Sequence, residues 1–255
     1  MDKKLQVSAK TLGQLAVPSL CPRCFWIRTH LSGQPPFSIF PRIFGDIDRY
    51  TKRLVHGYFD RHGKAPPWLR QLNVTGYIDP PSSRKFRMPM DGMLLTGEAD
   101  GIYMRADRSL VIADYKTAIC RADDPLMPVY EVQLNAYAVI ASHLEMGEVS
   151  ELALIYTEPC ADADAAAAKG SMRNDGFALG FEAAIHPVRK NPKQVYRLAE
   201  RAMEIWSSEE VPEPRHGCKD CRQLDRLVEL VKGPPPRVAA TASGWWQRLR
   251  AGVVM

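Results

Sequence analysis

Two short apolar runs lie next to each other near the middle of the chain, and their pattern predicts a β-hairpin. The first covers Gly97 to Met104 and the second Leu110 to Lys116, and both are rich in β-favouring residues. The polar cluster Ala106–Ser109 between them is typical of a turn. We therefore predict two antiparallel strands, the second of them buried before it emerges at a charged end.

Charged side chains lie at the ends of these runs. Residues i and i+2 of a strand share a face, so Asp114 and Lys116 are expected to point the same way and Tyr115 the opposite way. Glu98 and Asp100 share a face by the same rule. Pairing of the two runs is expected to bring Asp100 close to Asp114, within reach of one divalent cation.

The rest of the chain predicts helices and strands around this hairpin. An amphipathic helix is expected at 44–62, with Ile47, Leu54, Val55 and Tyr58 on its buried side. Other helices are expected at 8–30 (ended by Gly33–Pro36), 129–144 and 192–207, and strands at 152–157 and 177–188. Loops are expected at the Pro-rich segments 65–67 and 79–81 and in the Ala/Asp-rich stretch 161–176. This order predicts a mixed α/β core.

The predicted helix 129–144 carries a polar pair on an otherwise apolar segment. Gln133 and Tyr137 are spaced i, i+4 and therefore share one face of the helix. A helix that only fills a core has no need of a glutamine there. The pair therefore indicates a polar site beside the hairpin.

Two carboxylates with a lysine two residues after the second are typical of metal-assisted phosphodiester cleavage. Mg²⁺ prefers carboxylate, carbonyl and water oxygens. When bound, it lowers the pKa of a water molecule and neutralises charge on the phosphate. Lys116 supplies a compact positive charge that does not compete for the metal. Taken alone, Asp-x-Lys has a plainer interpretation, because charged residues at strand ends are commonly solvated.

Two C-x-x-C pairs form a second candidate site. Cys21 and Cys24 lie near the N-terminus, and Cys218 and Cys221 near the C-terminus. Two such pairs present four thiolates to one metal site, which suits zinc or an iron–sulfur cluster. The alternative is unlinked thiols or a disulfide. The remaining cysteines, at 120 and 160, are expected to be ordinary thiols.

Composition and charge agree with a globular protein without deciding its function. The chain has 255 residues, of which 45% are hydrophobic and 25% charged, and its net charge of +5 permits a polyanionic partner. No run approaches the length of a membrane span, and the first residues lack the apolar segment of a secretory signal. We expect a cytoplasmic protein, in which disulfides are rare.

The order G-E-A-D, then I-A-D-Y-K, then Q-L-N-A-Y resembles the PD-(D/E)XK nuclease superfamily. Within it, the chain looks most like the RecB/AddB branch and the CRISPR-associated exonucleases that share the Q-x-x-x-Y helix. The resemblance implies a restriction-endonuclease-like core, a mixed sheet flanked by helices. It also implies that Asp100 and Asp114 bind Mg²⁺ or Mn²⁺, that Lys116 is the catalytic lysine, and that Gln133 and Tyr137 contact DNA or steady the site.

The resemblance also bears on the cysteines. In the branches named, cysteines flanking the nuclease core hold a four-iron four-sulfur cluster, and here they would join the N- and C-terminal segments. The usual pattern there is one N-terminal and three C-terminal cysteines, whereas this chain has two and two. An iron–sulfur cluster is therefore expected, with zinc as the alternative.

A third metal ligand is expected from the helix upstream of the hairpin. Asp48 and His56 are the candidates, and their separation of eight residues places them on roughly one helical face. The RecB-like branches usually have histidine at this position, which favours His56. A hard cation prefers oxygen, which favours Asp48. We favour Asp48 slightly.

The sequence thus predicts a metal-dependent DNA nuclease, with exonuclease activity on ends or single strands expected. The alternatives are a non-catalytic DNA-binding module of the same fold and a zinc-stabilised scaffold protein. A partner helicase or CRISPR-adaptation proteins are possible associates. We expect one nuclease domain at 1–231 and a flexible tail at 232–255, whose Trp245, Trp246, Arg248 and Arg250 would meet nucleic acid, dock on the protein or stay disordered.

Overall fold

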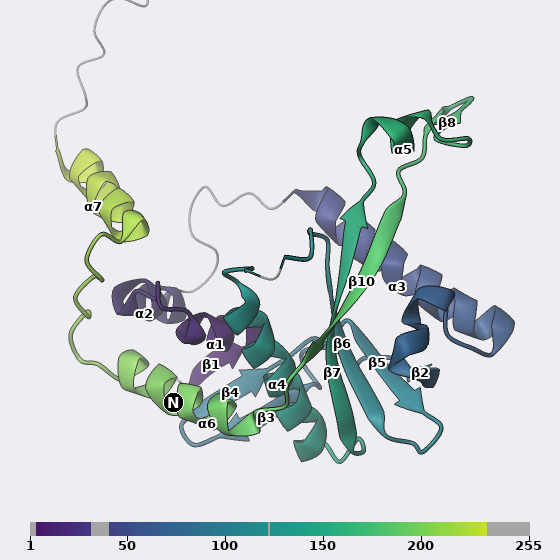
Figure 1. The fold of residues 1–255 in the computed structure, drawn as a ribbon. Helices are drawn as coiled ribbons and strands as arrows, with labels where there is room; N and C mark the ends of the chain where they lie inside the picture. Colours follow the sequence, from purple (N-terminus) through teal and green to yellow (C-terminus); the bar gives the residue numbers. More distant parts are fainter. Residues whose placement is uncertain (1–3, 32–40, 122, 234–255) are drawn as a thin grey trace, which may run out of the picture.

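A five-stranded mixed sheet forms the centre of the fold in the computed structural model, which describes residues 4–31, 41–121 and 123–233 (Figure 1). The strand order is β10 (Phe181–Val188), β7 (Val149–Pro159), β6 (Leu110–Lys116), β5 (Gly101–Arg105), β2 (Val74–Ile78). β6 and β7 are parallel, and the other neighbouring pairs are antiparallel. The predicted hairpin is present as β5 and β6.

Helices cover both faces of this sheet. The parallel pair β6 and β7 needs a crossover connection, which helix α4 (Met127–His143) provides. Helices α1 (Ala9–Gly13) and α6 (Pro192–Trp206) pack against α4 on that face. Helix α3 (Arg42–His62) packs on the other face, where its Val55 and Phe59 join the second apolar cluster. The mixed α/β class predicted from the sequence is confirmed.

Alternation along β6 separates the two apolar cores. Leu110 and Ile112 belong to the core that contains α4, whereas Val111 and Ala113 belong to the core that contains α3. Because side chains alternate along a strand, Asp114 continues the row that faces α4. The strand therefore directs its buried carboxylate toward the helix that carries Gln133.

A smaller sheet lies beside the central one. It consists of β1 (Leu5–Ser8), β4 (Met93–Thr96) and β3 (Arg87–Met90), with β1 parallel and β3 antiparallel to β4. The stretch from the first Pro-rich segment to the hairpin, which was expected to be loop, therefore contains regular structure in β3 and β4. It also contains the 3-10 helix η2 (Pro67–Leu72) and the edge strand β2.

The single N-terminal helix predicted at 8–30 is wrong. After β1, the short helix α1 and the 3-10 turn η1 (Gln14–Ala16) are separated from α2 (Pro22–His30). Ser8 caps α1 by accepting a hydrogen bond from the Thr11 backbone N–H. Pro18 in the intervening segment disfavours continuous helix, while Pro22 is tolerated in the first turn of α2, where no intrahelical N–H bond is lost.

The first strand of the hairpin is shorter than predicted. β4 ends at Thr96 and β5 begins at Gly101, so residues 97–100 lie outside any strand. Asp100 therefore immediately precedes β5, and the shared-face rule does not apply to it and Glu98. The loop still leaves Asp100 next to the end of β6, because Gly101 pairs with Ala113.

The helix predictions at 44–62, 129–144 and 192–207 are confirmed as α3, α4 and α6 to within a few residues. On α3, Val55 is buried as expected, but Leu54 is 39% exposed, so its assignment to the buried side is wrong. The sequence prediction also missed helix α7 (Lys219–Lys232), which lies apart from the sheet (Figure 1).

Strands β7 and β10 extend beyond the sheet as a two-stranded arm (Figure 1). The loop predicted at 161–176 lies at its tip and includes α5 (Ala163–Ala167), β8 (Met172–Arg173) and the start of β9 (Gly176–Phe177). Within the described residues, none of the helices has the length and apolar character needed to cross a bilayer. The predicted break at Gly33–Pro36 lies outside the described residues, as does the predicted tail from residue 234 on.

Candidate active site

A cavity of about 680 Å³ lies where the end of β6 meets α3, α4 and the loop before β5. Most of the residues predicted for the nuclease site line it. These are Asp48, Asp100, Asp114, Lys116 and Gln133. Residues from four elements, namely α3, the loop before β5, β6 and α4, are thus brought to one concave surface.

Asp114 is the most buried carboxylate of this cavity, with 2% of its surface exposed. Its Oδ1 accepts a hydrogen bond of 3.0 Å from Gln133 Nε2, and its Oδ2 is in ion-pair contact with Lys116 Nζ. Burial, followed by repulsion from Asp100, raises the pKa of Asp114 to about 7, although Lys116 opposes this shift. The site thus concentrates negative charge that a cation would balance.

Asp100 is held by two contacts from different elements. Its Oδ2 accepts a hydrogen bond of 2.9 Å from the Tyr115 backbone N–H, and its Oδ1 lies 2.7 Å from Lys52 Nζ. Lys52 also lies 2.9 Å from Asp48 Oδ2. Burial alone would lower the pKa of Lys52, but the two carboxylates outweigh it and raise that pKa.

Gln133 links the carboxylate to Tyr137, as their shared helical face suggested. Its Nε2 donates to Asp114 Oδ1 and, over 2.7 Å, to Tyr137 Oη. Tyr137 packs close to Gly97, where an added Cβ would come within 2.8 Å of the tyrosine ring. The absence of a side chain at Gly97 therefore leaves room for the Tyr137 ring in its observed position.

Lys116 lies over an aromatic ring. Its Nζ is 4.3 Å from the ring centroid of Tyr130, one turn before Gln133 on α4. Tyr115 points to the opposite face of β6, as predicted, and its hydroxyl lies 2.5 Å from that of Tyr103. The strand therefore separates the charged pair from an aromatic cluster on its far side.

The structure places the two candidates for the third ligand differently. Asp48 lines the cavity, whereas His56 is not among the lining residues. The His56 ring stacks on Tyr77 with centroids 4.0 Å apart, and its Nδ1 lies 3.7 Å from Asp79 Oδ1. Burial lowers the pKa of His56, and this outweighs the opposing effect of Asp79.

Several lining residues were missed by the sequence reasoning, among them Lys52 and Tyr130, which contact charged groups of the site. Lys52 is four residues after Asp48, so the helical spacing that joined Gln133 to Tyr137 would have placed it on the same face. Tyr130 is three residues before Gln133 and follows from the same rule. Applying the i, i+3 and i, i+4 spacing to both predicted helices would have found both residues.

A second cavity, of about 490 Å³, adjoins the first. Thr51 and Thr157 line both. Its walls are mainly apolar and aromatic and come from α3, η2 and β10: Ile43, Ile47, Tyr50, Leu54, Trp68, Phe181 and Ala183. Tyr50 is 66% exposed. We call this surface the aromatic groove.

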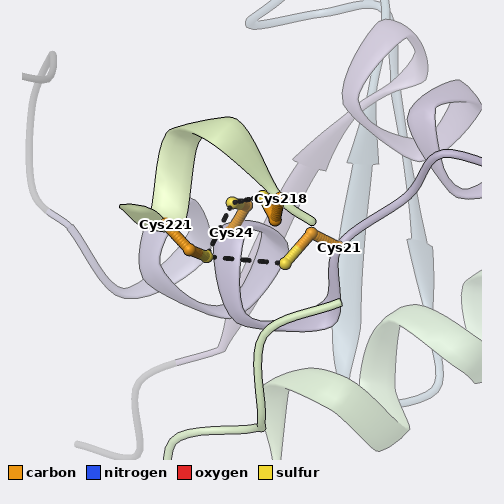
Figure 2. Close-up of side chains that lie close together, drawn as sticks. All are labelled: Cys21, Cys24, Cys218 and Cys221. Atoms are coloured by element: carbon orange, nitrogen blue, oxygen red, sulfur yellow. Dashed lines mark hydrogen bonds between the residues drawn. The ribbon is translucent and has the colours of Figure 1, made fainter. Parts of the chain in front are cut away.

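The four paired cysteines meet at one place, as Figure 2 shows. Their sulfur atoms all lie within 4.8 Å of one another. The thiols come from the starts of two helices, since Cys21 immediately precedes α2 and Cys218 immediately precedes α7. This cysteine cluster has the donor set for a metal. Of the other two cysteines, Cys120 is exposed and Cys160 is partly buried.

The backbone tunes these thiols. Burial acts to raise the pKa of Cys21, but hydrogen bonds from backbone N–H groups, including one of 3.3 Å from Arg215, lower it to about 7. Burial raises the pKa of Cys221 to about 11 and also raises that of Cys24. A metal binds cysteines as thiolates. The positive charge of a bound metal would therefore have to favour deprotonation of the Cys24 and Cys221 thiols.

The carboxylate cavity also fits a divalent cation. Among the described residues, Gln133 Oε1 is a buried acceptor with no hydrogen-bond donor, and Asp114 Oδ2 likewise accepts no hydrogen bond, although it is in ion-pair contact with Lys116 Nζ. Buried polar atoms are normally satisfied, so these two oxygen atoms are available to a further partner. Together with the neighbouring Asp100 carboxylate, these hard oxygen atoms suit Mg²⁺ or Mn²⁺.

Comparison with known families agrees with this fold and donor set. The sequence model of the PD-(D/E)XK nuclease superfamily matches residues 45–226, and the chain belongs to this superfamily. Its members are generally nucleases that use divalent metals. A comparison with curated proteins finds no match.

Among solved structures, the crystal structure of SSO0001 is similar to this chain at 15% sequence identity with a TM-score of 0.40. The similarity covers 92% of this chain and 88% of that one.

Proposed function

We propose that this protein is a Mg²⁺- or Mn²⁺-dependent DNA exonuclease of the RecB-like branch. The observation that carries the proposal is the buried Asp114, paired with Lys116 and hydrogen-bonded by Gln133, next to Asp100. This arrangement joins two carboxylates and a cation at one cavity. We further propose that residues 1–231 form a single nuclease domain.

Asp100 and Asp114 would hold the metal, and Asp48 is the proposed third ligand because it lines the same cavity. A bound divalent ion supplies Lewis-acid charge for the scissile phosphate and acidifies a coordinated water. The chain's own residues define where this happens. Lys52 would have to move from between Asp48 and Asp100 to make room, or remain as an additional positive charge beside the phosphate.

Lys116 is the proposed catalytic lysine. Its ammonium faces the cavity beside Asp114, where it can orient a water molecule toward phosphorus and stabilise the added negative charge as that water attacks. The ring of Tyr130 limits where the ammonium can move. Gln133 orients Asp114, and Tyr137 in turn accepts from Gln133, so both are proposed to position the ligand carboxylate.

The aromatic groove favours single-stranded DNA as the substrate. Exposed aromatic side chains stack on unpaired bases irrespective of sequence. Because the groove shares Thr51 and Thr157 with the carboxylate cavity, a strand stacked on Tyr50 would lead its backbone toward Asp100 and Asp114. We therefore propose that single strands, or frayed ends, enter along α3.

End-labelled single-stranded DNA incubated with Mn²⁺ tests the activity. We expect wild type to degrade it, Lys116→Ala to lose activity by at least about 100-fold, and Lys64→Ala, which alters an exposed lysine beyond α3, to behave like wild type. Full cleavage by Lys116→Ala would refute the catalytic assignment. A wild-type protein that binds DNA without cutting it would instead favour the non-catalytic DNA-binding module.

Equilibrium binding tests the path of the strand. Tyr50→Ala is expected to weaken single-strand binding about fivefold or more, because one stacked base is lost. Tyr196→Ala is the matched control, since Tyr196 is a 46% exposed tyrosine on α6 that does not line either cavity. Equal affinity of the two variants would rule out the aromatic groove. Absence of both DNA binding and metal dependence would favour a zinc-stabilised scaffold.

A further inference from the structure

We infer that the cysteine cluster is built for a single zinc ion and not for the four-iron four-sulfur cluster that the family resemblance implies. The inference rests on the spacing of the sulfur atoms and on the position of the two helices that supply them. It concerns a site separate from the carboxylate cavity and does not depend on the proposed nuclease activity.

The spacing of the sulfur atoms matches one shared ion. Cys24 Sγ lies 3.4 Å from Cys221 Sγ and 3.6 Å from Cys218 Sγ, and Cys21 Sγ lies 3.6 Å from Cys221 Sγ. Four thiolates that bind one zinc at about 2.3 Å with tetrahedral geometry lie about 3.8 Å from one another. The observed separations, none above 4.8 Å, fit that arrangement.

The same spacing does not accommodate a four-iron cluster. In such a cluster, each thiolate binds a different iron at a different corner of a cube, so the four sulfur atoms stand around the outside of the whole inorganic core. Four irons and four sulfides do not fit among cysteine sulfur atoms that are in mutual contact at 3.4 to 3.6 Å. Binding a cluster would require α2 and α7 to move apart.

The surroundings suit the net negative charge of a four-thiolate zinc site. Four thiolates and one Zn²⁺ leave a charge of about −2. Cys21 and Cys218 immediately precede α2 and α7, so the positive ends of two helix dipoles face the sulfur atoms. Arg215 adds a backbone N–H to Cys21 Sγ. Tetrahedral sulfur donors with C-x-x-C spacing are typical of structural zinc.

The ion would be the principal tie between α7 and the rest of the protein. All residues of α7 are described by the structure, and Cys221 is the one among them that is buried. The ion pair of 2.8 Å between Arg23 and Asp225 is partly exposed. Exposed ion pairs contribute little to stability. Figure 1 shows α7 at the periphery, beside α2 and far from the sheet. Loss of the metal is therefore expected to release α7 while the nuclease core persists.

Metal analysis of the full chain, purified without oxygen from cells supplied with both iron and zinc, tests the identity of the ion. We expect about one zinc per chain, no stoichiometric iron or acid-labile sulfide, and no visible absorbance band. Four irons with sulfide, or one iron without sulfide, would overturn the inference. Asp114→Asn should retain its zinc, so an inactive nuclease site would not affect this result.

Hydrogen exchange tests whether the bound metal holds α7 against the rest of the protein. In Cys221→Ser, the amides of 219–232 should exchange much faster than in wild type, while those of α4 keep their protection. Cys160→Ser is the control, because Cys160 lies outside the cluster. If Cys221→Ser does not fold, a strong chelator added to wild type should produce the same local change. Full protection of α7 after the metal is removed would contradict the proposed role.

Discussion

Lys52 Nζ lies 2.7 Å from Asp100 Oδ1, so an ammonium group from α3 contacts a proposed metal ligand directly. The same ammonium lies 2.9 Å from Asp48 Oδ2. It therefore balances the charge of two carboxylates that would hold a divalent cation if the proposed ligand assignment is correct. Lysine and metal are expected to compete for this position.

Replacing this lysine should tighten metal binding. Lys52→Gln removes the positive charge that faces Asp100, and the apparent Kd for Mn²⁺, measured by calorimetry, is expected to fall severalfold. Lys64→Gln, at an exposed site beyond α3, should leave it unchanged. Weaker binding by Lys52→Gln alone would show that the ammonium positions the carboxylates and does not compete with the metal.

Metal binding should depend on pH through Asp114. Because its pKa in the folded protein is raised to about 7, a proton competes with the metal below that pH. The apparent Kd for Mn²⁺ is expected to rise about tenfold for each pH unit below 7 and to level off above it. A flat profile between pH 5 and 8 would exclude Asp114 as a ligand.

The same raised pKa has a consequence for the metal-free protein. Between the unfolded value of 3.8 and about 7, the folded state binds a proton at Asp114 that the unfolded chain has released. Stability therefore falls as the pH rises through this window. Asp114→Asn should show a smaller fall in Tm between pH 5 and 8 than wild type, and an identical fall would contradict the assignment.

The two candidates for the third ligand make opposite predictions. If Asp48 is the ligand, Asp48→Asn should weaken Mn²⁺ binding about tenfold or more, whereas His56→Asn should leave it nearly unchanged. Loss of the stacking with Tyr77 should lower the Tm of His56→Asn modestly. The reverse pattern of metal affinities would identify His56 as the ligand. Helix α3 would then have to rotate when the metal binds.

Gly97 lies against two aromatic rings that pack beside the site, those of Tyr137 and Phe86. In Gly97→Ala, the new Cβ would lie 2.8 Å from the Tyr137 ring and 2.9 Å from the Phe86 ring. Overpacking of this kind costs about 1–3 kcal/mol, so we expect a lower unfolding free energy in urea. Gly45→Ala is the control: its Cβ meets nothing within 4 Å on helix α3, and it should stabilise slightly.

The part of the site that follows from local periodicity could be predicted from the sequence. The alternation in β6 assigned Asp114, Tyr115 and Lys116 to the correct faces, and the i, i+4 rule joined Gln133 to Tyr137. The ion pair between Lys52 and Asp100 could not be predicted in this way. It depends on how α3 packs beside the hairpin, which is a tertiary relationship between distant segments.

The errors have physical reasons as well. Strands β3 and β4 are only four residues each, too short for a periodic signal, and a proline within β3 reads as a break. The paired cysteines predicted a shared metal site across about 200 residues of chain. Their spacing in sequence carries no information on the distance between sulfur atoms, so the size of the bound group required the fold.

Because side chains alternate along β6, the pairing register of this strand decides both whether the core forms and whether Asp114 and Lys116 face the cavity. A one-residue slip would turn Asp114 and Lys116 toward Val55 and Phe59 and would expose the polar network on α4 to apolar side chains. An extra residue in the turn at 106–109 should therefore be tolerated. An extra residue between Val111 and Ala113 should abolish folding and metal binding together.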